Sequence, residues 1–128
     1  MNINEKKSFD VIVIGGGAAG MMAAITAASN GADTMILEHK DRVGKKILST
    51  GNGKCNYTNE LQGVTFYRGD DPAFVLPVME QFGFDETVSF FEKLGIYPKN
   101  RNGYYYPASE QAASVSDVLR MEIGRASC

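Results

Sequence analysis

The segment FDVIVIGGGAAG, residues 9–20, decides the fold. Its first half, residues 9–14, is a short apolar run rich in Val and Ile, which is typical of a strand buried on both faces of a parallel sheet. A glycine turn with the spacing Gly15-x-Gly17-x-x-Gly20 follows at once. A buried strand that ends in such a turn predicts the first corner of an α/β fold.

The residues after the turn complete the pattern. Residues 18–32 are rich in alanine and methionine, which favours a helix, and Gly31 is suited to stop it. Residues 33–38, DTMILE, predict a second buried strand that ends in an acid. Strand, turn, helix and strand in this order form a βαβ unit, whose two strands run parallel. We therefore expect a Rossmann-like α/β domain with a parallel sheet covered by helices.

Each glycine of the turn has a physical role in binding a dinucleotide. Gly15 permits the tight turn, Gly17 lets the backbone approach a diphosphate, and Gly20 lets helix and strand pack closely. The diphosphate then meets free N–H groups at the positive end of the helix dipole. The candidate cofactor-binding residues of this turn are Gly15, Gly16, Gly17, Ala18, Ala19 and Gly20.

Glu38 ends the second predicted strand, where a carboxylate can accept hydrogen bonds from ribose hydroxyl groups. An acid at this position disfavours a 2′-phosphate, so NADP is not expected here, while NAD and FAD both stay open. His39 is a candidate contact for the adenosine, and the alternative is an exposed, merely solvated histidine. A glycine turn without any ligand is the other alternative, but the flanking strands, helix and acid together favour a dinucleotide site.

A basic loop follows, in a chain whose net charge is −2. Between Asp41 and Cys55 the cations are Arg42, Lys45, Lys46 and Lys54. The loop is either a solvated surface or a segment that runs back over the cofactor. Its second half, LSTGNGKCNYTN at residues 48–59, shows neither helical nor strand periodicity. It is not a Walker A loop, because Cys55 replaces the Ser or Thr that would hold magnesium. No histidine lies near Cys55 in the sequence, so we do not expect a nucleophile there.

Together these motifs resemble the N-terminal part of the BaiN/YhiN-like flavoproteins, which are FAD-containing, NAD(P)H-linked oxidoreductases. The resemblance runs from about Ser8 to Met121, and it rests on GGGAAG, the spacing to Glu38, RVGKKILSTGNGKCNYTN and NGYYYPASEQAASVSDVL. It implies a Rossmann-like FAD-binding domain of the glutathione-reductase-like type, with an incomplete parallel sheet. It also implies that the basic loop lies along the FAD. By this resemblance the phosphates are near Gly44, Lys45 and Lys46, and the flavin ring is near Gly51, Gly53, Cys55 and Asn56.

The middle of the chain predicts two helices. Residues 71–82 predict a helix that Asp71 caps and that Pro77 breaks. Residues 85–95 predict a second helix, capped by Asp85 and ended by Gly95. The apolar stripe of this second helix, which we expect to face the core, consists of Val88, Phe91 and Leu94.

The last third of the chain predicts a hairpin and a helix. Asn102-Gly103 predicts a turn between short strands near Tyr97 and Tyr104–Tyr106. Ser109 is a candidate cap for a helix over Glu110 to Met121. The three consecutive tyrosines are expected to be sheet residues and not a stack for a substrate.

Composition narrows the class of protein. A net charge of −2 and a pI near 5.4 argue against a nucleic-acid partner. Two cysteines and one histidine make neither a disulfide framework nor a zinc site, and they suit a reducing cytoplasm. Residues 11–32 carry no charge and are long enough to span a bilayer, but their central glycines favour a βαβ unit over a membrane segment. We expect a cytoplasmic protein without a membrane partner, and its oligomeric state stays open.

The resemblance implies a protein far longer than this chain. We expect residues 1–121 to be the N-terminal part of an FAD/NAD(P)-binding domain, and residues 122–128 to be a non-native or truncated tail, because IGRASC fits no family pattern. The full-length enzyme is expected to take hydride from NAD(P)H and to pass it to a small organic acceptor, while the fragment alone is expected to be inactive. No residue here is a convincing catalytic acid or base. The alternative function is an NAD-binding module of a dehydrogenase or regulatory protein.

Overall fold

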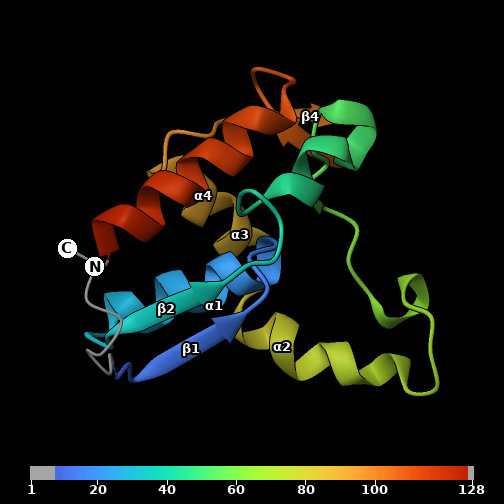
Figure 1. The fold of residues 1–128 in the computed structure, drawn as a ribbon. Coiled ribbons are helices and arrows are strands. Elements are labelled where there is room, and N and C mark those ends of the chain that lie inside the picture. Colours follow the sequence, from blue (N-terminus) through green and yellow to red (C-terminus); the bar gives the residue numbers. More distant parts are fainter. Residues whose placement is uncertain (1–7, 127–128) are drawn as a thin grey trace.

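The structure is a computed structural model of the chain, and it describes residues 8–126 (Figure 1). Strands are labelled β, α-helices α and 3-10 helices η. In chain order the elements are β1 (Val11–Ile14), α1 (Ala18–Ser29), β2 (Thr34–Leu37), η1 (Lys45–Gly53), β3 (Thr58–Asn59), η2 (Val64–Phe66), η3 (Pro72–Val75), α2 (Leu76–Gln81), α3 (Phe84–Lys93), β4 (Pro98–Arg101), β5 (Tyr104–Pro107) and α4 (Ala112–Ala126).

The predicted βαβ unit is confirmed. β1 and β2 pair in parallel, in a register that runs from Val11 opposite Thr34 to Ile14 opposite Leu37. α1 connects them and packs against both strands. The predicted stop at Gly31 is confirmed as well, because Gly31 has a φ of 89° just after the helix.

The prediction that these strands are buried on both faces is wrong for this chain. The side chains of Ile12, Ile14 and Leu37 are 53%, 86% and 50% exposed. α1 covers one face of the pair, and no other element among residues 8–126 covers the other (Figure 1). The strands therefore have the composition of buried strands, but the described residues supply cover for one face only.

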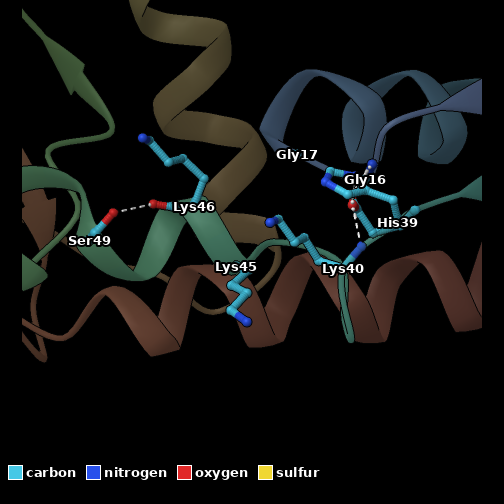
Figure 2. Close-up of a pocket in the computed structure, with 8 residues that line it drawn as sticks. Gly16, Gly17, His39, Lys40, Lys45, Lys46 and Ser49 are labelled. Atoms are coloured by element: carbon cyan, nitrogen blue, oxygen red, sulfur yellow. Dashed lines mark hydrogen bonds and ion pairs between the residues drawn. The ribbon is translucent and has the colours of Figure 1, made fainter.

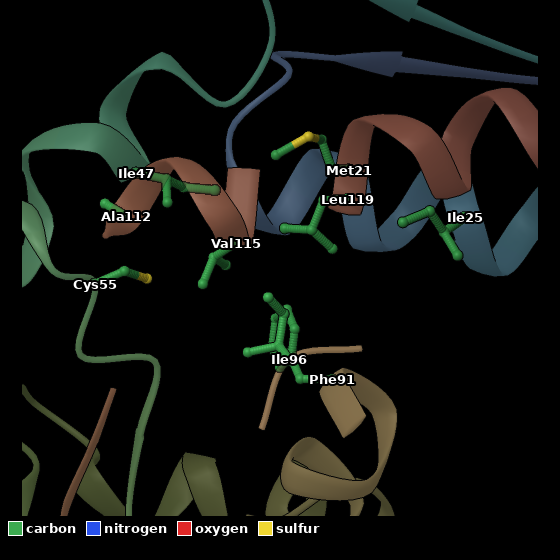
Figure 3. Packing of buried hydrophobic residues seen from close by; sticks show 9 residues of the cluster. All are labelled: Met21, Ile25, Ile47, Cys55, Phe91, Ile96, Ala112, Val115 and Leu119. Carbon is green, nitrogen blue, oxygen red and sulfur yellow. The ribbon is translucent and has the colours of Figure 1, made fainter. Parts of the chain in front are cut away.

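The core lies beside the strand pair and not upon it. Figure 3 shows buried side chains from α1, η1, α3 and α4 that converge on one another. α4 packs along α1 and also contacts η1, so this long helix joins the βαβ unit to the basic loop. The buried members of the cluster are Met21, Ile25, Ile47, Cys55, Phe91, Ile96, Ala112, Val115 and Leu119.

A second, antiparallel sheet has the strand order β3-β5-β4. The predicted turn at Asn102-Gly103 is confirmed, since it joins β4 to β5 and both residues have positive φ, 54° and 91°. Two residues with positive φ make the tight turn that matches the twist of a hairpin. The three tyrosines lie in β5, as expected of sheet residues.

The helices of the middle segment differ from the prediction in their caps. The break at Pro77 is confirmed, because η3 ends at Val75 and α2 begins at Leu76. However, Asp85 does not cap α3. The helix begins one residue earlier, and the N–H of Gly83 donates to the carboxylate of Glu86 over 3.0 Å. A carboxylate on the third residue of a helix satisfies the N–H of the residue before the helix, which is one half of a capping box.

The stripe predicted on α3 is buried in part. Phe91 lies in the core cluster, whereas Val88 and Leu94 are half-buried. Phe91 also packs its ring against that of Tyr57, with the centroids 5.0 Å apart. The core role of this stripe therefore rests mainly on Phe91.

The last helix begins later and ends later than predicted. Glu110 has a φ of 54°, which an α-helix does not allow, and α4 starts only at Ala112. The hydroxyl of Ser109 accepts a 3.2 Å hydrogen bond from the N–H of Gln111, within the turn that precedes the helix. α4 then continues past Met121 to Ala126.

The tail at residues 122–128 is accordingly helical over most of its length. Ile123 is partly buried against the core cluster, so the helix still packs at this point. Ser127 and Cys128 lie outside the described residues. A non-native origin of the tail stays a prediction.

The uncharged run at residues 11–32 forms β1, the glycine turn and α1. α1 has 12 residues, and none of the helices within residues 8–126 combines the length and the apolar character that crossing a membrane requires.

Candidate dinucleotide-binding site

The glycine turn connects the end of β1 to the start of α1, and it is hydrogen-bonded to the end of β2. Gly15 has a φ of 95°, and its N–H donates to the carbonyl of Leu37 over 2.8 Å. A Cβ atom placed on Gly20 would lie 1.8 Å from the carbonyl oxygen of Gly15. A side chain at Gly20 would therefore push the helix away from the turn, whereas at Gly15 the positive φ itself favours glycine.

Gly17 is the residue from which α1 starts, and its surroundings are open. Its carbonyl accepts a 2.9 Å hydrogen bond from the N–H of Met21, while its own N–H has no partner among the described residues. A Cβ atom on Gly17 would meet nothing within 4 Å. The space beside this backbone and an unpaired donor are what a diphosphate needs.

Glu38 lies directly beyond β2 and faces the glycine turn. One carboxylate oxygen accepts a 2.7 Å hydrogen bond from the N–H of Gly16, and the other accepts a 3.0 Å bond from the N–H of Lys40. These bonds, that of Lys40 first, hold the pKa of the Glu38 carboxyl below its usual range. His39 lies beside it, with Nδ1 3.1 Å from the carboxylate and a largely exposed side chain. The ionised carboxylate still has lone pairs for ribose hydroxyls.

A pocket of about 390 Å³ lies between the glycine turn and the basic loop (Figure 2). Most residues predicted for the adenosine and phosphate positions meet there. Its lining consists of Gly16, Gly17, Glu38, His39, Lys40, Lys45, Lys46 and Ser49.

The cations of the pocket are not equivalent. Lys45 donates to the carboxylate of Asp41 over 2.9 Å, so its charge is offset at the surface. Lys46 and Lys40 form no ion pair with any residue that the structure describes, and both line the pocket. They leave a positive charge surplus beside Gly17, which favours an anion.

Lys40 and Ser49 line the pocket but were not among the residues predicted from the sequence. Lys40 follows Glu38 closely and belongs to the same basic run, so charge alone could have suggested it. Ser49 lines the pocket with Lys45 and Lys46 because η1 is helical here, and this spacing carried no signal while the segment was expected to be irregular.

The basic loop is thus not irregular, which corrects the sequence-based expectation. η1 begins as a 3-10 helix at Lys45 and is interrupted at Thr50, Gly51 and Asn52. Gly51, Asn52, Gly53 and Cys55 all have positive φ, between 54° and 79°. Two glycines and an asparagine are residues that adopt this conformation readily, which explains the GNG sequence in the loop.

The two glycines of this kink lie in different surroundings, and neither lines the pocket. A Cβ atom on Gly51 would lie 2.4 Å from the backbone nitrogen of Asn56 and 3.3 Å from the ring of Tyr106. Gly53 has open space around it. Their predicted position near a flavin ring stays a prediction.

Gly44, predicted near the phosphates, lies one layer behind the pocket. It has a φ of 72° and its N–H donates to the carbonyl of Gly16 over 2.7 Å. On its other side it touches Met21 of α1 and Ser116 of α4. It therefore supports the glycine turn and does not line the pocket itself.

Other predicted residues line a second, apolar pocket of about 350 Å³ on the far side of η1. Cys55 is 6% exposed and belongs to the core cluster, where Figure 3 shows its sulfur directed toward Val115. Burial raises the pKa of the Cys55 thiol, so the thiolate needed for a nucleophile is disfavoured. The predicted site residues along this pocket are Ala18, Ala19, Cys55 and Asn56.

Asn56 and Tyr57 fasten the loop beneath this pocket. With its amide oriented to satisfy both polar atoms, Asn56 donates to the carbonyl of Thr58 over 2.8 Å and to that of Tyr105 over 3.2 Å. The buried hydroxyl of Tyr57 has no hydrogen-bond partner among the described residues, and burial raises its pKa to about 12. Tyr57 is therefore a neutral donor at physiological pH.

Residues 9–128 match the family described as HI0933-like protein Rossmann domain. The chain belongs to this family. The match confirms both the resemblance drawn from the motifs and the Rossmann-type fold.

Three curated relatives show how far the similarity extends. The 3-dehydro-bile acid delta(4,6)-reductase of Clostridium scindens is 53% identical over 115 residues, which are 88% of this chain and 28% of the relative. The ribosomal RNA dihydrouridine synthase of Escherichia coli is 33% identical over 111 residues, 87% of this chain and 28% of the relative. The flavin-containing amine oxidase A of Canis lupus familiaris is 33% identical over 98 residues, 76% of this chain and 18% of the relative. The chain thus spans less than a third of the length of these proteins.

A solved structure agrees with the fold. Thermovibrio ammonificans THI4 superposes with a TM-score of 0.58 at 16% identity, over 93% of this chain and 36% of that one. At this identity the likeness concerns the fold alone.

Proposed function

We propose that this chain is the N-terminal part of the FAD-binding domain of a flavin-dependent oxidoreductase. By this proposal the complete protein, which we call the full-length protein, takes hydride from NAD(P)H and passes it to an organic acceptor. The observation that carries the proposal is the pocket in which the open backbone of Gly17, whose N–H has no partner in the described part of the chain, lies beside the Glu38 carboxylate. The relative named as a flavin-containing amine oxidase supports FAD over NAD.

The residues present suit the adenosine diphosphate half of FAD. Glu38 is positioned to accept hydrogen bonds from ribose hydroxyls, because its carboxylate is held by two backbone N–H groups and cannot swing away. The N–H of Gly17 and the start of α1 are suited to the diphosphate, and Lys46 adds a charge that no acid within residues 8–126 offsets. When bound, FAD supplies the hydride transfer chemistry itself.

The acceptor is proposed to be a small unsaturated molecule. The reductase of Clostridium scindens, at 53% identity, supports an acceptor of this kind. The Escherichia coli relative is named for ribosomal RNA, but a net charge of −2 gives this part of the protein no surplus of positive charge for a phosphate backbone. We therefore favour a small molecule over RNA, in a reducing cytoplasmic setting.

The test is to purify the full-length protein, add FAD and remove the excess by gel filtration. We expect flavin absorbance to travel with the protein and to bleach when NADH or NADPH is added without oxygen. Titrations with FAD and NAD then separate the two candidate functions. A colourless protein that binds NAD tightly and FAD not at all would contradict the proposal and support an NAD-binding module.

A further inference from the structure

Gly44 is held between two helices that are far apart in the sequence. A Cβ atom on Gly44 would lie 2.5 Å from the hydroxyl oxygen of Ser116 and 3.0 Å from the terminal methyl group of Met21. Ser116 lies on α4, is 4% exposed and has its hydroxyl 3.4 Å from the carbonyl oxygen of Gly44. At that distance the hydrogen bond is weak, so the contact is mainly one of close packing.

Gly44 in turn determines how the glycine turn is oriented. Its N–H donates to the carbonyl of Gly16 over 2.7 Å. A trans peptide is planar, so the N–H of Gly17 points opposite to the carbonyl of Gly16. The bond from Gly44 therefore directs the N–H of Gly17 away from the core, on the side where Gly17 lines the pocket.

We propose that Ser116 is a positioning residue for the diphosphate of the cofactor. By packing on Gly44 it fixes the bond from Gly44 to Gly16, and with it the direction of the Gly17 N–H. This inference rests on the proposed FAD-binding function. It assigns to Ser116 of α4, which lies 72 residues beyond Gly44 in the chain, a part in shaping the site.

The size of the side chain at position 116 decides whether the backbone of Gly44 keeps its place. The buried Ser116 hydroxyl oxygen already lies 3.4 Å from the Gly44 carbonyl oxygen, so we expect a larger side chain at Ser116 to press on the backbone of Gly44. Buried overpacking of this kind forces a backbone to move. Here the backbone that moves is bonded directly to the glycine turn.

The experiment measures FAD affinity in the full-length protein for variants of both residues. We expect Ser116→Val to weaken FAD binding by about tenfold, and Ser116→Ala by less than about threefold, since alanine removes only the weak bond. The control is Ser114→Ala on the same helix, where the hydroxyl group is hydrogen-bonded to Ser109. The FAD affinity of this variant should equal that of the wild type.

A double-mutant cycle tests the contact itself. Gly44→Ala clashes with the Ser116 hydroxyl, so it should weaken FAD binding by about a hundredfold in the wild type and by only about tenfold in the Ser116→Ala background. The part that remains reflects the positive φ of Gly44 and the contact of the added Cβ atom with Met21. This rescue is not expected if Ser116 merely stabilises α4.

The ³¹P resonances of bound FAD provide a readout of the phosphate environment. We expect them to shift in Ser116→Val and not in Ser114→Ala. Should Ser116→Val fail to fold, the cycle with Ser116→Ala decides alone. Equal effects of Gly44→Ala in both backgrounds would overturn the inference, even when the wild type binds FAD normally. A wild type that binds no FAD would overturn the proposed function first, and this inference with it.

Discussion

The carboxylate of Glu38 accepts a 2.7 Å hydrogen bond from the backbone N–H of Gly16. This bond ties the end of β2 to the glycine turn, so one side chain both shapes the turn and faces the pocket. Its second oxygen is held by the N–H of Lys40. Removing the side chain therefore affects the turn as well as any ribose contact.

The first prediction concerns this double role. Glu38→Ala in the full-length protein should weaken FAD binding by about tenfold or more, because a ribose contact is lost and Gly16 loses its partner. Equilibrium dialysis with FAD measures the change. Glu80→Ala, which removes an exposed glutamate of α2, is the matched control. Unchanged FAD retention in Glu38→Ala would show that Glu38 has been misplaced.

The second prediction is a pH dependence. The pKa of Glu38 is lowered by the N–H groups of Lys40 and Gly16. A carboxyl group with a lowered pKa stabilises the fold above its ordinary pKa of about 4.3, and this contribution is lost as the pH falls through the lowered value. The difference in free energy of unfolding between the wild type and Glu38→Gln should be constant above about pH 5 and should shrink below it. Urea unfolding at a series of pH values checks this, and a difference independent of pH would contradict it.

The third prediction separates folding from binding by means of two glycines. Gly20→Ala should destabilise the fold by roughly 3 kcal/mol or more, because its Cβ atom would lie 1.8 Å from the carbonyl oxygen of Gly15. Gly17→Ala should change stability by at most about 1 kcal/mol, since its Cβ atom meets nothing within 4 Å and its φ is −77°. The same Gly17→Ala variant should nevertheless lose most of its FAD affinity. Thermal unfolding without FAD and FAD titration, measured on both variants, give the comparison.

The fourth prediction concerns residues 1–128 expressed alone. Ile12, Ile14 and Leu37 are exposed on the uncovered face of the strand pair, so this chain should associate and should not retain FAD. Ile14→Lys should reduce the association, because that side chain is 86% exposed and can carry a charge without cost. Gel filtration recorded at protein and flavin wavelengths measures both effects. A monomeric wild-type peak that carries stoichiometric flavin would show that this stretch is a self-sufficient domain.

The fifth prediction concerns the reactivity of Cys55. Burial raises the pKa of its thiol, so it should react with a disulfide reagent far more slowly in the folded protein than in urea. The measurement is made in a Cys128→Ser background of the 128-residue chain, so that one thiol is observed. Fast modification in the folded state would mean that Cys55 is accessible and not a core residue.

The local part of the fold follows from the sequence. The βαβ unit, the stop at Gly31, the hairpin turn and the break at Pro77 are each determined by residues within a few positions, through backbone conformation and apolar periodicity. The caps of α3 and α4 could not be read in this way. Asp85 and Ser109 are both acceptable caps, but α3 already begins at Phe84, and the positive φ of Glu110 delays the start of α4.

The candidate site, too, has one part that neighbouring residues determine and another that depends on the tertiary structure. The sequence alone determined that the GxGxxG turn and Glu38 lie next to each other, because the pairing of the two strands of a βαβ unit brings their ends together. Only the tertiary structure decided that Gly44 packs against Ser116, that Cys55 belongs to the core, and that one face of the strands is left open. Such features depend on packing between segments far apart in the sequence, such as α4 and η1. A local sequence pattern does not encode this packing.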